Sequence, residues 1–162
     1  MLAVAGNLKS GHSGPGVPVY YRTAIDPDKQ PAPGPVDGKG CRSVYLEARR
    51  LFPSEWLAAF DAPKPNILTA HRTEMNVPAQ SLGLMNDPFV LQQAALLGKR
   101  VASLPDLTDA DRVGRMYQLA FARPPSAAER DRALTFLAVS GGKPWREFAH
   151  ALFQMKEFIY LR

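Results

Sequence analysis

Apolar residues recur at alternating steps of four and three from residue 90 to residue 104, and this spacing constrains the fold more than any other feature. The residues that share it are Val90, Ala94, Leu97, Val101 and Leu104. Because an α-helix turns once every ~3.6 residues, these positions lie on one face, which must be buried against other elements. Pro88 stands where a helix can begin and Pro105 where it must stop. The spacing therefore predicts a long helix inside a helical core.

Two shorter helices are predicted between residue 53 and Pro88. Ser54 can cap the segment SEWLAAF, because its hydroxyl can accept a hydrogen bond from a free amide of the first turn. Pro78 opens the segment PAQSLGLMN, at a position where the missing N–H costs nothing. Asn86 and Asp87 can end that helix and cap the next one.

Three more helices are predicted after residue 105. Thr108 or Asp109 begins the first, Ser126 and Glu129 form a capping box before the second, and Gly141-Gly142 ends the second. Apolar residues at steps of three and four from Trp145 to Ile159 mark the third. The residues expected to face the core are Val113, Met116, Tyr117, Ala120, Phe121, Ala133, Phe136, Leu137, Trp145, Phe148, Leu152, Met155 and Ile159. Such helices need each other's apolar faces, so residues 53–162 are predicted to form a small helical bundle.

Residues 1–52 have a different composition and are predicted to be irregular. Many of the chain's 15 prolines and 12 glycines lie there, and these residues suit neither helices nor strand ladders. Residues 17–25 and 42–50 are rich in Val, Ile and Tyr, which favours one or two short strands that pair antiparallel. The predicted fold class is therefore mainly α, with an irregular N-terminal part, in one domain that we expect to be truncated at its N-terminus.

Charge and cysteine content exclude several kinds of site. The formal net charge is +5, but the basic residues are scattered and do not alternate with aromatic residues, so no nucleic-acid partner is predicted. Cys41 is the only cysteine, so there is no internal disulfide, no zinc spacing and no Cys-x-x-Cys-His haem motif, and its role stays open. No apolar stretch is long enough for a membrane span. We therefore expect no cofactor and no metal in this chain.

The strongest candidate site is the polar segment HRTEMNVPAQSLGLMND. A histidine near a carboxylate can act as a general base, but no nucleophile is tied to His71 unless the fold brings Cys41 or Ser43 beside it. The alternative is a structural clamp in which amide and guanidinium groups satisfy backbone groups between the two parts of the chain. The candidate ligand or clamp residues are Arg42, Ser43, Tyr45, His71, Arg72, Asn76, Gln80 and Asn86, and we predict no catalytic residue.

Several blocks of the chain follow one another in a characteristic order. They are Arg42-Ser43-Val44-Tyr45, Phe60-Asp61, the set Asn76, Pro78, Gln80 and Leu82, the turn Met85-Asn86-Asp87-Pro88, and the corner from Ala122 to Glu129. In order and spacing these blocks resemble the C-terminal domain of unknown function catalogued as family 1553, which is found in large planctomycete proteins. Leu68 stands where many members have a cysteine, so no redox or metal role of that cysteine carries over.

The resemblance implies a setting for the domain. It points to a scaffolding or binding module in a larger exported protein of the periplasm or cell envelope, with upstream domains of the same polypeptide as partners. It also allows haem c in a companion domain and leaves carbohydrate open as a further partner. The alternative is part of an oxidative or hydrolytic enzyme that acts on polysaccharide and is coupled to a cytochrome c domain. Whether the chain is an enzyme stays open, because domain association is weak warrant for chemistry.

Overall fold

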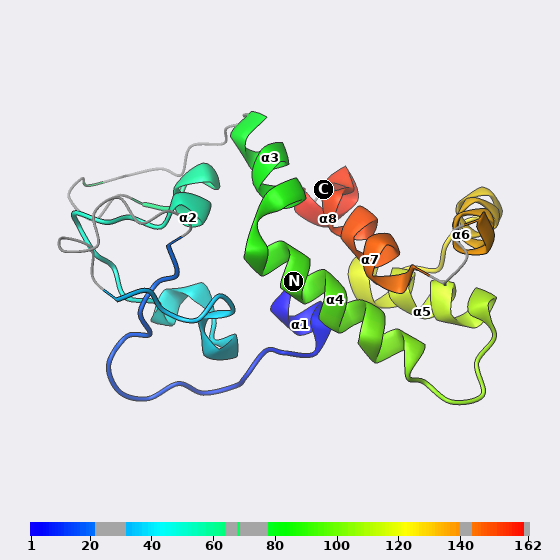
Figure 1. The fold of residues 1–162 in the computed structure, drawn as a ribbon, viewed down its shortest axis with the longest axis horizontal. Coiled ribbons are helices and arrows are strands. Elements are labelled where there is room, and N and C mark those ends of the chain that lie inside the picture. Colours follow the sequence, from blue (N-terminus) through cyan, green and yellow to red (C-terminus); the bar gives the residue numbers. More distant parts are fainter. Residues whose placement is uncertain (22–31, 64–67, 69–77, 140–143, 161–162) are drawn as a thin grey trace. The chain divides into compact units, whose positions relative to one another are not determined.

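The computed structural model describes residues 1–21, 32–63, 68, 78–139 and 144–160 (Figure 1). The chain divides into two compact units. Residues 1–7 and 90–162 form the first, called here the helical unit, and residues 8–89 form the second, called the loop unit. The mainly α fold class is confirmed, and α2 and α3 lie in the loop unit.

The helical unit contains most of the helical residues. Its elements are α1 (Leu2–Ala5), α4 (Pro88–Ala102, in this unit from Val90), α5 (Asp109–Phe121), α6 (Ala127–Val139), α7 (Trp145–Gln154) and α8 (Lys156–Ile159). The predicted apolar spacing is confirmed on α4, where Val90, Ala94, Leu97 and Val101 are all fully buried. Because these side chains stack along one face, α4 supplies a continuous apolar surface to the unit. The helix ends at Ala102, before Leu104, whose backbone N–H donates to the carbonyl of Val101.

Capping fixes where α5 and α6 begin. Thr108 is the N-cap of α5, and Asp111 completes a reciprocal capping box with it. At α6 the predicted box is present, since the N–H of Glu129 donates to Ser126 Oγ over 3.3 Å and the N–H of Ser126 donates to Glu129 Oε2 over 2.7 Å. These bonds satisfy amides that a helix leaves free in its first turn.

Two predictions about the helical unit are wrong. The spacing predicted one helix from Trp145 to Ile159, but the backbone becomes extended at Met155 and divides it into α7 and α8. Phe136 was expected in the core, yet it is 40% exposed and its ring lies 6.5 Å from that of Phe148. In both places the apolar spacing is present in the sequence, but tertiary packing decides where the helix ends and which side chains are buried.

The loop unit is built mostly from turns. Its elements are η1 (Gly38–Gly40), η2 (Ser43–Tyr45), α2 (Glu55–Ala59) and α3 (Pro78–Asn86). Trp56 of α2 packs on α3, because a Cβ built on Gly83 would lie 3.3 Å from the Trp56 ring, and its ring also lies beside those of Phe60 and Phe89. This aromatic group holds α2 and the start of α4 around one side of α3.

The predicted antiparallel pair is not found in the described part of the loop unit. Val17 and Leu46 instead form a single parallel bridge, in which the N–H of Val17 donates to Tyr45 and the N–H of Glu47 donates to Val17. Pro18 has no N–H to extend a ladder, and residues 43–45 are taken up by the turn η2. The two segments therefore lie side by side as predicted, but they form a single parallel bridge and not an antiparallel pair of strands.

A close approach between α4 and α7 generates the first prediction. A Cβ built on Gly98 would lie 2.8 Å from the backbone N of Arg146 and from the carbonyl carbon of Trp145. We expect Gly98→Ala to lower the free energy of unfolding by about 1–3 kcal/mol, since backbone atoms cannot move aside as a side chain can. Urea denaturation followed by circular dichroism measures the change.

Gly114 on α5 provides the matched control. A Cβ there meets no atom within 4 Å, so Gly114→Ala should raise stability by up to ~1 kcal/mol through helix propensity alone. If both substitutions changed stability in the same direction, close packing of α4 on α7 would not be the reason for the glycine at position 98.

Candidate functional site

Three of the sequence-predicted site residues lie together in one exposed turn of the loop unit. Arg42 is the N-cap of η2, and Ser43 and Tyr45 belong to it. The N–H of Tyr45 donates to the carbonyl of Arg42 over 2.9 Å, which closes the turn. The Tyr45 ring lies 5.5 Å from the ring of His12 at an angle of 56°. The turn thus presents a guanidinium, a hydroxyl and a partly covered ring side by side.

Two further predicted residues lie on α3. Gln80 is buried, and Asn86 lies at the end of the helix, where its Nδ2 donates to the carbonyl of Leu82 over 3.1 Å. The predicted link between α3 and α4 is confirmed: the N–H of Asp87 donates to Gly83, and Asp87 Oδ1 accepts from the N–H of Phe89. Asn86 and Asp87 therefore serve backbone groups at a helix junction.

His71, Arg72 and Asn76 lie outside the described residues. The candidate site is therefore described in two parts, the turn at residues 42–45 and the helix α3. The role of the polar segment as a clamp stays a prediction.

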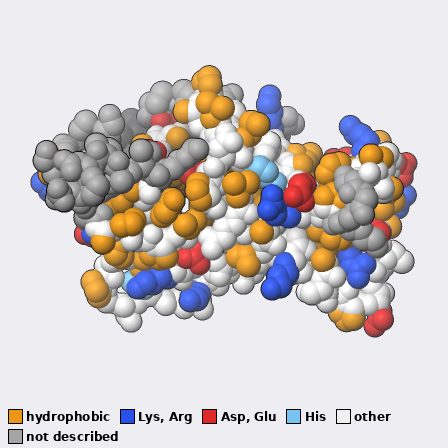
Figure 2. All heavy atoms as spheres, in the orientation of Figure 1, with side chains coloured by type: hydrophobic (Ala, Val, Ile, Leu, Met, Phe, Trp, Pro, Cys, Tyr) orange, Lys and Arg blue, Asp and Glu red, His pale blue; other side chains and the backbone are white. Residues whose placement is uncertain are grey.

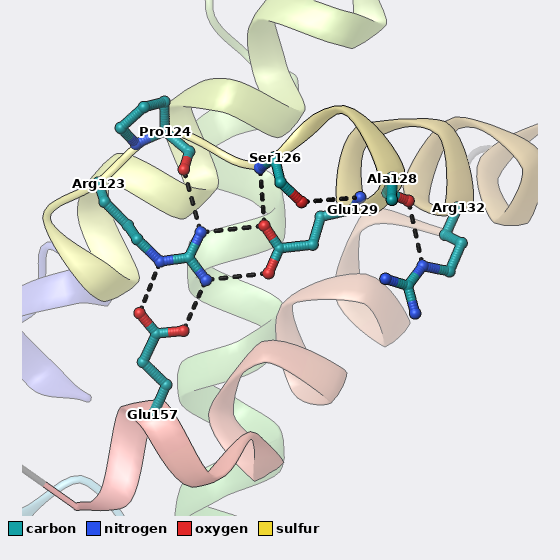
Figure 3. A network of polar contacts seen from close by, with 7 residues as sticks. All are labelled: Arg123, Pro124, Ser126, Ala128, Glu129, Arg132 and Glu157. Carbon is teal, nitrogen blue, oxygen red and sulfur yellow. Dashed lines mark hydrogen bonds and ion pairs between the residues drawn. The ribbon is translucent and has the colours of Figure 1, made fainter.

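The most extensive polar network of the described residues was not predicted from the sequence. It centres on Arg123, which follows α5 and lies between the start of α6 and α8 (Figure 3). Arg123 Nη1 and Nη2 donate to the two carboxylate oxygens of Glu129, each over 2.9 Å. Nε and Nη2 donate to the carboxylate of Glu157, each over 2.6 Å. Nη1 also donates to the carbonyl of Pro124 over 3.1 Å.

This arrangement uses all five N–H donors of the guanidinium. The group also lies over the rings of Tyr117 and Phe121, at 5.6 and 5.7 Å from their centroids. Bidentate pairs of this kind fix geometry as well as charge. Arg123 thus links α5, α6 and α8. Because no donor is left for a ligand, we assign it a structural role.

The ion pair between Arg123 and Glu129 shifts the pKa of both groups. The hydrogen bonds from Arg123, followed by that from the Ser126 N–H, lower the pKa of Glu129 to about 2. Hydrogen bonds to Glu157 and then to Glu129 raise the pKa of the Arg123 guanidinium further above its already high value. Arg123 and Glu129 are therefore both ionised at neutral pH.

The buried amide of Gln93 in the helical unit has no such support. Gln93 on α4 is fully buried, and neither its side-chain oxygen nor its nitrogen has a hydrogen-bond partner among the described residues. A buried amide without partners costs roughly 1–3 kcal/mol in proteins. No local pattern indicates this burial, since glutamine is common on the exposed side of helices.

Metal and membrane features are not found in the described ranges. No three His, Cys, Asp or Glu side chains of that part of the chain group as a metal site requires. Likewise, none of the described helices combines the length and the hydropathy of a membrane span.

The buried thiol of Cys41 lies 4.0 Å from the carbonyl of Lys39.

Comparison with known proteins gives one match. The family model PSD1, described as a protein of unknown function (DUF1553), matches residues 1–137. No curated protein and no solved structure matches the chain. The matched range contains the turn at residues 42–45, helix α3 and the Arg123–Glu129 pair, whereas Glu157 lies beyond it.

The Arg123 network generates a prediction about acid stability. A carboxylate whose pKa is lowered by folding stabilises the protein while it is ionised, and this contribution is lost as the pH falls from about 4.5 to about 2. Glu129→Gln should lower the free energy of unfolding by about 1–2 kcal/mol at pH 7. This value is modest because the Arg123 side chain is 36% exposed, so solvent screens the ion pair. Stability of the variant should depend less on pH in that window, as urea denaturation at several pH values would measure.

Glu147→Gln is the control for this experiment. Glu147 pairs with the neighbouring Arg146 over 3.1 Å, and both side chains are at least half exposed. We expect a change below ~0.5 kcal/mol at pH 7. An acid-dependence of Glu129→Gln equal to that of the unmodified protein would disprove the stabilising role of the network.

Gln93 generates a prediction of increased stability. Gln93→Met keeps a similar shape and removes the unsatisfied amide, so it should raise the free energy of unfolding by about 1–3 kcal/mol. Thermal and urea denaturation measure it, with the exposed Gln92→Met as the control that should change stability by less than ~0.5 kcal/mol. Destabilisation by Gln93→Met would mean that the amide is satisfied in solution.

Proposed function

The chain belongs to the PSD1 family of proteins of unknown function (DUF1553), and we propose that it serves as a scaffolding or binding module of a larger exported protein. The partners in this proposal are other domains of the same planctomycete-type polypeptide, which the sequence resemblance associates with a cytochrome c domain in the cell envelope. One feature of the loop unit supports it above all, namely the outward face of helix α3.

Helix α3 has one face that is satisfied within the loop unit. Gln80 and Leu84 are buried on it, and Gly83 lies against the ring of Trp56. These positions fall on one side of the helix, as steps of three and four require. The helix is therefore anchored, and its other face is held outward.

The outward side of α3 carries an apolar strip, which the exposed polar residues Ser81 and Asn86 flank. Pro78, Leu82 and Met85 follow one another at steps of four and three, which places them on one face. Leu82 is 59% exposed and Met85 is 52% exposed. No residue of α3 carries a charge. Hydrophobic side chains are gathered in Figure 2 over the part of the surface where α3 lies.

This face differs from the exposed side of α5. On α5 the exposed positions are polar, for example Asp111, Arg115 and Gln118, while Val113 and Met116 are buried. Two large apolar side chains exposed on one uncharged helix face indicate an interaction surface, since burying each gains roughly 1.5–3 kcal/mol. A partner that covers α3 would have an apolar surface, because the helix has no charge with which to select a charged one.

Cysteine labelling tests whether another domain covers α3. In the 162-residue chain, Leu82→Cys and Val139→Cys should both react readily with a maleimide, because both positions are exposed. In the longer protein, Leu82→Cys should react at least about tenfold more slowly, because burial at a domain interface excludes the reagent. Mass spectrometry of the labelled peptides gives the rates.

Val139→Cys on α6 is the matched control, since it is an exposed apolar position on a helix of the other unit and should label at the same rate in both proteins. The unmodified protein gives the background from Cys41, which is buried. Equal labelling of Leu82→Cys in both proteins would show that no domain of the same polypeptide covers α3.

A further inference from the structure

We propose that the turn of residues 38–45, together with Lys9 and His12 beside it, is a second interaction surface, which binds an acidic peptide segment with an apolar side chain. This rests on the proposed role as a binding module but uses residues apart from α3. The residues that form the surface, called here the basic turn, are Lys9, His12, Lys39, Arg42, Val44 and Tyr45.

Backbone contacts bring these residues together from two segments of the loop unit. The N–H of Lys9 donates to the carbonyl of Gly40 over 2.9 Å, which places Lys9 beside the turn that carries Lys39 and Arg42. The packing of His12 on Tyr45 joins the same two segments a few residues further on. Lys and Arg side chains are gathered in Figure 2 at the lower left, where Figure 1 shows these segments.

The three cations of the basic turn are exposed. No carboxylate forms an ion pair with Lys9, Lys39 or Arg42 in the part of the chain that the structure describes. The nearby carboxylate of Asp37 accepts a hydrogen bond from the backbone N–H of Lys39 over 3.0 Å, and Glu47 pairs with Arg49 over 2.8 Å. The surface therefore keeps an excess of positive charge that an acidic partner can neutralise.

The backbone at Lys39 supports a role for its side chain. Gly38, Lys39 and Gly40 have φ angles of 57°, 57° and 74°, so three successive residues adopt the left-handed conformation. For a residue with a Cβ this conformation costs roughly 1–2 kcal/mol, and glycine would adopt it freely. The backbone would therefore favour glycine over lysine at position 39. What lysine adds there is an exposed ammonium group.

Apolar side chains beside the cations favour a peptide over other anionic partners. Val44 is 74% exposed and Tyr45 is 38% exposed, in the same turn as Arg42. Arginine and tyrosine are among the residues enriched at protein interfaces, and an aliphatic neighbour adds apolar contact. A single-strand nucleic-acid site would need successive exposed rings along a positive groove, whereas this turn offers one ring that is partly covered by His12.

Binding of synthetic peptides tests the proposal. The probe is a peptide of about twelve residues with glutamate at alternate positions around a central leucine, and its neutral counterpart has glutamine at those positions. Calorimetry at several salt concentrations should show binding of the acidic peptide that weakens as salt rises, and no binding of the neutral one. Lys39→Gly with Arg42→Gln should weaken binding at least about tenfold, because it removes two of the three exposed cations.

Two further variants separate the contributions. Lys39→Gly relieves the left-handed strain, so the melting temperature should not fall, and lost binding would not reflect unfolding. Val44→Ser should weaken binding without changing its salt dependence, since it removes only apolar contact. The control Lys99→Gln with Arg115→Gln removes the same charge from exposed sites of the helical unit and should change binding less than about twofold.

Three outcomes would overturn the inference. The acidic peptide fails to bind, or the two double variants weaken binding equally, or heparin or a single-stranded oligonucleotide binds the basic turn more tightly than the peptide. In the last case the surface takes a different class of polyanion. None of these outcomes affects the labelling rates at position 82, so this inference and the docking role of α3 can fail separately.

Discussion

Burial of one face of α4 is the constraint on which the helical unit depends. Four apolar side chains of that face are fully buried, and at Gly98 the helix approaches the backbone at the start of α7 closely enough to exclude a methyl group. Side chains that are this closely packed cannot be exchanged for others of different volume without cost. The Arg123 network then fixes the ends of α5, α6 and α8, whose short lengths would not be stable by themselves.

The sequence predicts those parts of the fold that local signals determine. The buried face of α4 follows from steps of three and four, and the capping box of α6 follows from Ser126 and Glu129. The contact of Arg123 with Glu157 joins residues that are 34 positions apart, and no local pattern announces it. The same holds for Met155, where an unbroken apolar spacing hides a break in the helix.

The candidate site was predictable only in part. Arg42, Ser43 and Tyr45 were identified from their resemblance to a family block, and the structure places them in one exposed turn. Lys9, His12 and Lys39 join that turn through a backbone hydrogen bond and a ring contact between segments that lie far apart in sequence. The Gly-Lys-Gly sequence was a signal for left-handed backbone, since glycines on both sides of a residue favour a tight turn.

The two units differ in how they use their polar and apolar groups, and both surfaces that we propose for binding lie in the loop unit. The guanidinium of Arg123 in the helical unit is saturated, and the apolar faces of α4 and α7 are buried. The loop unit instead exposes apolar side chains on an uncharged helix and three cations that form no ion pair with the described residues. Apolar contact depends little on ionic strength and charged contact depends on it strongly, so the two surfaces respond differently to salt. A partner held by both would be steered by the basic turn and retained by α3.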